Sequence, residues 1–288
     1  MNPIISGWYA DPEARFYAGR YYIYVTKSFS AYSDQMNIDA FSSDDLTHWK
    51  KHENILDMSG FPYIHRAVWA PTIAYRNGKY YLVFASNDIQ NNDQYGGLEI
   101  AVSDSPAGPF KALLGHPLID RFINYAQPID GHLFKDDDGT VYLYWGGWQH
   151  CNAAIMRQDM MGFEPLPSGE WCKAITPPGY VEGPCMLKRN GLYHFMWSAG
   201  DWVNGSYHVS VSTSISPLDI SEHGHIILQS SDIAEGPGHN GYLNLPGTDY
   251  WKIVYHHRIL GDREPGHRVL CMDDLQFDED YIHPVRMT

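Results

Sequence analysis

The feature that most constrains the fold is a strand–turn–strand unit that recurs five times along the chain. Each copy has a short apolar segment, a glycine-bearing turn and an aromatic-rich segment that ends in small or polar residues. Repeats with a period of this length are typical of solenoids, propellers and related arrays. The copies lie about 50–60 residues apart and begin at Asp11, Ala70, Ile129, Glu182 and Gly236.

Each unit has a glycine in its turn, at Gly19, Gly78, Gly139, Gly191 and Gly247. Three of these turns are Asn-Gly or Asp-Gly dipeptides, which suit two-residue hairpin turns because they tolerate positive φ. They are Asn77-Gly78, Asp138-Gly139 and Asn190-Gly191. We therefore expect an antiparallel hairpin in every unit.

Further alternating segments follow most hairpins, as in residues 38–56, 99–119 and 209–228, so that one unit holds about four strands. Four-stranded sheets repeated radially form a β-propeller, in which neighbouring blades protect one another's edges. A two-sheet sandwich is the alternative, but it gives no reason for five similar units. No linker rich in Pro, Gly or Ser divides the chain. The sequence predicts an all-β, five-bladed propeller that occupies residues 1–288 as one domain.

The net charge of the chain limits the classes of partner that it is expected to bind. With 34 acidic and 20 basic residues, the formal net charge is −14. This field repels phosphate backbones and anionic lipids, so we expect neither nucleic acid nor a membrane as a partner. Aromatic residues make up 14% of the chain, including 21 tyrosines and 9 tryptophans. Such side chains fill β-sheet cores and also form the flat surfaces on which sugars stack.

Cysteine usage and the N-terminus bear on the compartment. Cys151, Cys172, Cys185 and Cys271 have neither CxxC nor zinc-ligand spacing, so we expect free thiols. The first residues, MNPIISGWYADP, lack the basic and long apolar regions of a signal peptide. A cytoplasmic location is therefore the expectation, with a processed, secreted form left open.

Three of the five units place an acidic residue at the same point of their first strand. The first strand of every propeller blade lines the central axis, so Asp11, Asp130 and Glu182 should meet there, with residues 69–71 and His239 contributed by the other two blades. Clustered carboxylates repel one another and are costly to desolvate, so stability alone does not account for them. The pattern predicts a functional pocket at one end of the axis.

Paired carboxylates beside aromatic residues suit glycoside hydrolysis. One carboxyl group protonates the leaving oxygen while an ionised partner activates water. Calcium binding is the competing interpretation, because Asp, Glu and His are all potential ligands. The chain lacks, however, the dense Asp/Asn spacing of a dedicated calcium loop.

The sequence resembles glycoside hydrolase family 43, the five-bladed propellers that include α-L-arabinofuranosidases, β-xylosidases and arabinanases. The resemblance covers nearly the whole chain and rests on five short motifs in order at blade spacing. These are ADP at 10–12, WAP at 69–71, ID at 129–130, EGP at 182–184 and GPGH at 236–239.

The resemblance implies a role for each carboxylate. Asp11 would be the general base that activates water, and Glu182 would be the general acid. Asp130 would hold Glu182 in position and raise its pKa through like-charge proximity. The implied mechanism is inversion in one displacement, for which the carboxyl groups of the acid and the base lie about 6.5–9.5 Å apart.

Further residues are candidates for contact with a sugar. Arg268 matches the arginine with which the family contacts the substrate or its acids, and Trp69 is expected to form an apolar wall against a pentose ring. Core packing is the alternative for each aromatic residue. The predicted substrate-binding residues are Trp69, Ile129, Arg268, Phe29 and Trp8. Trp148 is a further candidate, but the direction of its side chain cannot be deduced from the glycines before it.

His239 is singled out among the histidines by its GPGH context. In the family this histidine lies near the propeller axis, often beside a water-coordinated calcium ion. The resemblance thus implies a possible structural Ca²⁺ at His239, and a buried core histidine is the alternative. The chemistry itself requires no cofactor.

The resemblance predicts an inverting exo-glycosidase that acts on hemicellulose-derived pentose sugars. We expect an α-L-arabinofuranosidase acting on arabinoxylan oligosaccharides. A β-xylosidase acting on xylo-oligosaccharides is the alternative, followed by an endo-arabinanase. From another class, a non-catalytic sugar-binding propeller is possible, but binding alone requires no acid with a raised pKa. A propeller that binds proteins would lack the axial acids.

Overall fold

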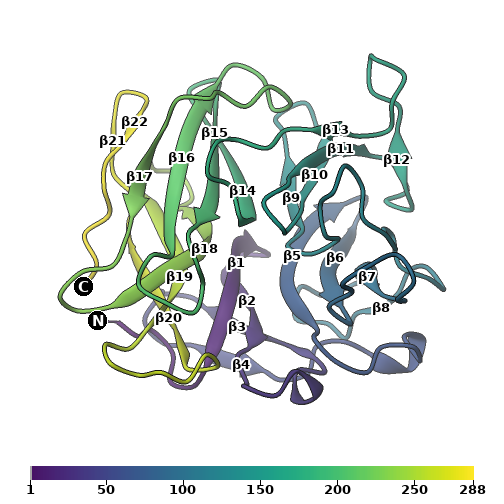
Figure 1. The fold of residues 1–288 in the computed structure, drawn as a ribbon, viewed down its shortest axis with the longest axis horizontal. Helices are drawn as coiled ribbons and strands as arrows, with labels where there is room; N and C mark the ends of the chain where they lie inside the picture. The colour runs from purple at the N-terminus through teal and green to yellow at the C-terminus, as the bar shows by residue number, and fades with distance from the viewer. Residues whose placement is uncertain (1) are drawn as a thin grey trace.

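The computed structural model describes residues 2–288, and Figure 1 shows their sheets arranged around a central axis. Each inner strand contacts the inner strands of the two neighbouring blades, and the fifth contacts the first, so the ring is closed. The inner strands are β1 (Tyr9–Tyr17), β5 (Trp69–Arg76), β9 (His132–Lys135), β14 (Glu182–Arg189) and β18 (Glu235–Asn244). The predicted five-bladed, all-β propeller is confirmed.

Blades one, two and four are antiparallel meanders of four strands in chain order. Blade one continues with β2 (Arg20–Lys27), β3 (Ile38–Ser43) and β4 (Lys50–His52). Blade two continues with β6 (Lys79–Ser86), β7 (Gly97–Ser103) and β8 (Lys111–Ala112). Blade four continues with β15 (Leu192–Ala199), β16 (His208–Ser214) and β17 (Gly224–Leu228). Two short 3₁₀ turns, η1 (Tyr32–Asp34) and η2 (Met58–Gly60), are the helical elements found within residues 2–288.

Blade three has an additional strand. Its meander of β9, β10 (Val141–Trp145), β11 (Asn152–Met156) and β12 (Phe163–Glu164) is joined by β13 (Lys173–Ala174), which also pairs with β11. Blade five has three strands, β18, β19 (Trp251–Arg258) and β20 (Arg268–Asp274). A small hairpin of β21 (Phe277–Asp278) and β22 (Tyr281–Ile282) follows it.

The segment before β1 completes blade five on its outer edge. Ile5 forms an antiparallel bridge with Leu270 in β20, and the Ile4 N–H donates to the Leu270 carbonyl at 3.0 Å. The Asn2 side chain donates to Thr288 Oγ1 at 3.3 Å, which brings the two ends of the described chain together, as Figure 1 also shows. The first and last parts of the chain thus close the ring by pairing within one blade.

Backbone angles test the predicted hairpin turns. Asn77-Gly78 and Asn190-Gly191 both have positive φ at both residues, 50° and 79° in the first and 53° and 81° in the second, as a type I′ turn requires. The prediction is wrong for the third dipeptide. Only Gly139 of that pair has positive φ, and the Asp136 N–H donates to the Thr140 carbonyl, so the turn has three residues.

Apolar side chains fill the space between the blades. The cluster that joins blades one and two, for example, includes the fully buried Tyr24, Ile38, Phe61, Phe84 and Phe110. The four cysteines are free, as the sequence predicts. Among residues 2–288, no helix has the length and apolar character needed to span a bilayer.

Candidate active site

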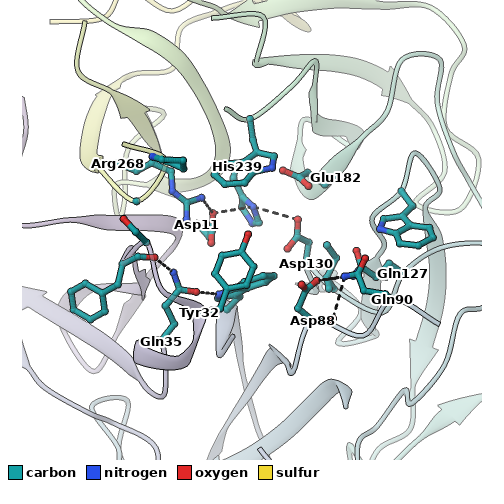
Figure 2. A pocket seen from close by; sticks show the side chains of 18 residues that line it. Asp11, Tyr32, Gln35, Asp88, Gln90, Gln127, Asp130, Glu182, His239 and Arg268 are labelled. Carbon is teal, nitrogen blue, oxygen red and sulfur yellow. Dashed lines mark hydrogen bonds and ion pairs between the residues drawn. The ribbon is translucent and has the colours of Figure 1, made fainter. Parts of the chain in front are cut away.

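A pocket opens at the axis and brings the three predicted carboxylates together. Asp11, Asp130 and Glu182 all line it (Figure 2). The same pocket is lined by five other residues predicted from the sequence, Trp69, Ile129, Phe29, Arg268 and His239, and also by Trp148.

Trp8 is the one predicted substrate-binding residue that does not line this pocket. Its ring stacks on the His267 ring, with centroids 4.1 Å apart and planes 12° from parallel. It also packs against the apolar cluster that blades four and five share. Trp8 is close to Asp11 in sequence, but its ring packs against His267 and this apolar cluster.

A backbone irregularity at the start of each inner strand positions the pocket residues. The residue there is left-handed in every blade, with φ of 51° at Asp11, 46° at Ala70, 54° at Asp130, 60° at Gly183 and 43° at His239. Non-glycine residues seldom adopt this conformation, and it persists where the surrounding structure imposes it. In β1, β5, β14 and β18 the pairing register also shifts at this point, as in a β-bulge, which redirects side chains.

The prediction that the three acids occupy the same position of the repeat is wrong for Glu182. Asp11 and Asp130 occupy the left-handed position, whereas Glu182 lies one residue earlier, before Gly183. Within the repeat, Glu182 therefore corresponds to Trp69 and Ile129 rather than to the other two acids. Two adjacent positions of the repeat, and not one, thus supply the three carboxyl groups of the pocket.

Asp11 is a buried carboxylate surrounded by nitrogen atoms. Its Oδ1 lies 3.4 Å from Arg268 Nη1, 3.4 Å from His239 Nδ1 and 3.5 Å from His256 Nδ1. Burial raises the pKa of Asp11. Attraction to His239, Arg268 and His256, together with a hydrogen bond from Thr26, outweighs this effect, so the pKa falls below its ordinary value, to about 2. Because burial also lowers the pKa of both histidines, Arg268 is the permanent cation beside Asp11. Asp11 is therefore ionised at neutral pH.

The pKa values of Asp130 and Glu182 are raised, in contrast to that of Asp11. Burial raises the pKa of Asp130 well above its ordinary value, and the charges of Glu182 and Asp11 add to this. A hydrogen bond from the Gly183 N–H to Asp130 Oδ2, at 3.1 Å, opposes the rise. The pKa of Glu182 is also raised, chiefly by burial, with Asp11 contributing. The pair thus retains a proton at a pH at which Asp11 has lost its own.

His239 bridges the two aspartates and offers no evident metal site. Its Nδ1 lies 3.4 Å from Asp11 Oδ1 and 3.5 Å from Asp130 Oδ2 (Figure 2). In the chain from residue 2 to residue 288, no group of three or more His, Cys, Asp or Glu side chains is placed to hold a metal ion. Calcium prefers six to eight oxygen ligands. The described residues thus provide no cluster of protein ligands for the predicted calcium ion, and no step below depends on one.

Several pocket residues were not anticipated from the sequence. Asp88 Oδ1 accepts hydrogen bonds from Gln127 Nε2 at 3.0 Å and from Gln90 Nε2 at 2.7 Å, which fixes a further carboxylate in the wall. Gln35 accepts a hydrogen bond from Trp69 Nε1 and so orients the indole ring. These residues lie outside the repeated motifs, in connections whose course depends on the packing of the blades.

Two more unanticipated residues act on the charged groups of the site. The Tyr207 hydroxyl donates to Glu182 Oε1 at 2.8 Å, and its ring stacks on His256. The Arg268 guanidinium lies 5.5 Å from the centroid of the Trp202 ring, within the range of a cation–π contact. Arg268 Nε also donates to Ser28 Oγ at 2.8 Å. The arginine beside Asp11 is thus held from two sides.

A propeller whose axial pocket combines an ionised carboxylate, two carboxyl groups with raised pKa values and aromatic walls has the features of a glycosidase site. Comparison with known proteins agrees. The sequence profile of Glycosyl hydrolases family 43 matches residues 1–282, and the chain belongs to this family of glycoside hydrolases.

Individual relatives extend the comparison. The chain is 41% identical to a β-D-galactofuranosidase of Aspergillus niger, over 100% of this chain and 85% of that protein. It is 26% identical to a xylosidase/arabinosidase of Humicola insolens, over 97% of each. Among solved structures, an α-L-arabinofuranosidase of Clostridium thermocellum superimposes with a TM-score of 0.78 at 30% identity, covering 97% of this chain and 94% of that one.

Proposed function

We propose that the protein is an inverting exo-glycosidase that removes terminal α-L-arabinofuranosyl groups from neutral hemicellulose oligosaccharides such as those of arabinoxylan. The observation that carries the proposal is the separation of two protonation states in one pocket. Asp11 has a pKa of about 2, while burial raises the pKa values of Glu182 and Asp130. Carboxyl groups whose environments push their pKa values apart supply an acid and a base at the same pH.

Asp11 is the proposed general base. It accepts a proton from a water molecule as the oxygen of that water bonds to the anomeric carbon. Glu182 is the proposed general acid and gives its proton to the glycosidic oxygen as the bond from this oxygen to the anomeric carbon breaks. One displacement thus inverts the anomeric centre, with no covalent sugar intermediate.

Other residues support the two proton transfers. Arg268 keeps Asp11 ionised, and His239 holds Asp11 and Asp130 in a fixed relation. Asp130 is the proposed positioning residue, because the two carboxyl groups repel each other when both are ionised, so that the pair tends to keep a proton. Trp69, Ile129 and Phe29 provide apolar surface for the sugar ring.

The relatives support a furanose in the pocket. α-L-Arabinofuranose and β-D-galactofuranose have the same configuration at every ring carbon, and they differ in the length of the exocyclic arm. A pocket that binds one ring therefore accommodates the stereochemistry of the other. The 41% identity to a β-D-galactofuranosidase favours galactofuranoside hydrolysis as the second candidate. β-Xylosidase activity is the third, supported by the xylosidase/arabinosidase relative.

A panel of nitrophenyl glycosides tests the proposal. The substrates are the α-L-arabinofuranoside, the β-D-galactofuranoside and the β-D-xylopyranoside, with Asp11→Ala as the control for contaminating activity. We expect the highest kcat/KM on the arabinofuranoside, and arabinose as the sugar released from arabinoxylan oligosaccharides. A preference for galactofuranoside would establish the second candidate, and hydrolysis of none of them by the wild type would overturn the proposal.

A further inference from the structure

A second hollow adjoins the axial pocket on the side of blade three. It is lined by Asn92, Phe122, Asn124, Tyr125, Trp148 and His150. Trp148 lines both this hollow and the axial pocket, so the two are adjacent at this residue. We call the six residues the aromatic groove.

The groove exposes aromatic surface to solvent. Tyr125 is 80% exposed and Trp148 is 50% exposed. The Phe122 ring meets the Trp148 ring edge-on, with centroids 4.9 Å apart, and the Tyr125 and His150 rings are 5.6 Å apart. Exposed apolar surface that gathers in one place marks interaction sites. Tyr and Trp combine a flat apolar face with a polar atom, as contact with a sugar ring requires.

The backbone of the groove is held in an unfavourable conformation. Asn124, Tyr125, Trp148 and Gln149 are all left-handed, with φ of 49°, 66°, 55° and 65°. Side-chain amides anchor one of the two segments, since Asn152 donates to the Ile123 carbonyl at 2.9 Å and accepts from Asn124 at 2.8 Å. The aromatic rings are therefore presented on fixed loops, which lowers the entropy lost when a ligand binds.

The groove lies on the side of the pocket that carries Glu182. The Gln149 N–H donates to the carbonyl of Val181, the residue before Glu182, at 3.2 Å. The Tyr180 hydroxyl donates to the Gly146 carbonyl at 2.7 Å, which ties the same loop to the same segment. Because the proposed acid protonates the leaving oxygen, the leaving group lies beside Glu182. The groove continues the pocket in that direction.

We infer that the aromatic groove binds the leaving-group part of a neutral oligosaccharide while its terminal sugar occupies the axial pocket. The inference rests on the proposed function. A sugar of the departing chain stacks on Tyr125 and Trp148, and Asn92, Asn124 and His150 offer hydrogen bonds to its hydroxyl groups. The six lining residues include no Lys, Arg, Asp or Glu, so they provide no ion pair for a charged ligand.

Tyr125→Ala tests the groove, because Tyr125 does not line the axial pocket. Tyr250→Ala is the matched control, since Tyr250 is 73% exposed in the turn between β18 and β19 and lines neither hollow. A tenfold change in kcat/KM corresponds to about 1.4 kcal/mol. We expect Tyr125→Ala to lose up to about tenfold in kcat/KM on an arabinoxylan oligosaccharide, mainly through KM.

Nitrophenyl glycosides, which have no sugar in the groove, should be hydrolysed by Tyr125→Ala as by the wild type. Equal losses on both substrates, or no difference from Tyr250→Ala, would overturn the inference. A change of oligomeric state in Tyr125→Ala would instead identify the groove as a protein interface. If the wild type hydrolyses no glycoside, the proposed function fails. Binding in the groove is then measured by the quenching of tryptophan fluorescence that xylo-oligosaccharides cause. Loss of that quenching in Tyr125→Ala would support the groove, and unchanged quenching would refute it.

Discussion

The Tyr207 hydroxyl donates a 2.8 Å hydrogen bond to Oε1 of Glu182, from a side chain that is 1% exposed. A donor to the ionised form stabilises the carboxylate, so this bond lowers the pKa of Glu182 and opposes the rise that burial causes. It also fixes the orientation of the carboxyl group. Tyr207 thus sets both the geometry and the proton affinity of the proposed acid.

Tyr207→Phe should therefore move the alkaline limb of the pH profile. The proposed acid must be protonated, so activity is lost as pH rises through its pKa. Removing the donor raises that pKa, and we expect the limb to shift to higher pH while kcat falls because the carboxyl group is less well oriented. Profiles of kcat/KM against pH measure the shift, with Tyr250→Phe as the surface control. A shift to lower pH would contradict the assigned donor.

Asp130→Asn should move the same limb in the opposite direction. Repulsion between the two carboxylates disfavours the state in which both Asp130 and Glu182 are ionised, so they titrate as a pair. Without the charge of Asp130 the remaining acid loses its proton at lower pH, so the alkaline limb shifts downward. Comparison of the two variants in one buffer series is decisive, since a purely structural role for both residues predicts lower activity with no shift of the limb.

Inversion predicts which anomer appears first. Proton NMR during hydrolysis of a nitrophenyl arabinofuranoside should show the β-anomer of arabinose before mutarotation mixes the two forms. The physical basis is a single displacement by water activated at Asp11, with no glycosyl-enzyme intermediate. Initial release of the α-anomer would mean that one carboxylate acts as a nucleophile and that the roles are misassigned.

Local sequence signals were sufficient to predict the architecture of the blades. Asn77-Gly78 and Asn190-Gly191 form the expected turns because positive φ at both positions is a local preference of these residues. The completion of blade five could not be predicted in this way. It depends on pairing between Ile5 and Leu270, which are separated by nearly the whole chain and carry no local mark of their partnership.

The residues of the site likewise include some that local sequence predicts and some that it does not. Asp11, Asp130 and Glu182 could be predicted because they lie in repeated motifs at the inner strands, and the repeat superimposes those motifs. Tyr207 and Asp88 could not, because they lie in connections whose position follows from the packing of neighbouring blades. Trp8 does not line the pocket, since closeness to Asp11 in sequence does not determine what its ring packs against.

Ring closure gives a stability prediction at Ile5. This side chain is 9% exposed and packs in the cluster that blades one and five share. Ile5→Ala removes buried apolar volume where the first and last parts of the chain join, and we expect the free energy of unfolding to fall by roughly 2–5 kcal/mol. Urea unfolding measures it, with Ile215→Ala, at an 86% exposed position, as the control. Equal stability of the two variants would show that the Ile5 contact contributes little.

Substrates with different leaving groups distinguish the proton transfer from Glu182 from the proton transfer to Asp11. Natural glycosides leave as alkoxides that need a proton, so Glu182→Ala should lose about 10²–10⁴-fold in rate on arabinoxylan oligosaccharides. Aryl glycosides with good leaving groups depart with little protonation and should be affected much less. Asp11→Ala should slow both classes to a similar degree, because water activation is needed whatever group leaves. Rates of all three proteins on a dinitrophenyl and an oligosaccharide substrate provide the comparison. If Glu182→Ala slows both substrates equally, Glu182 is not the acid.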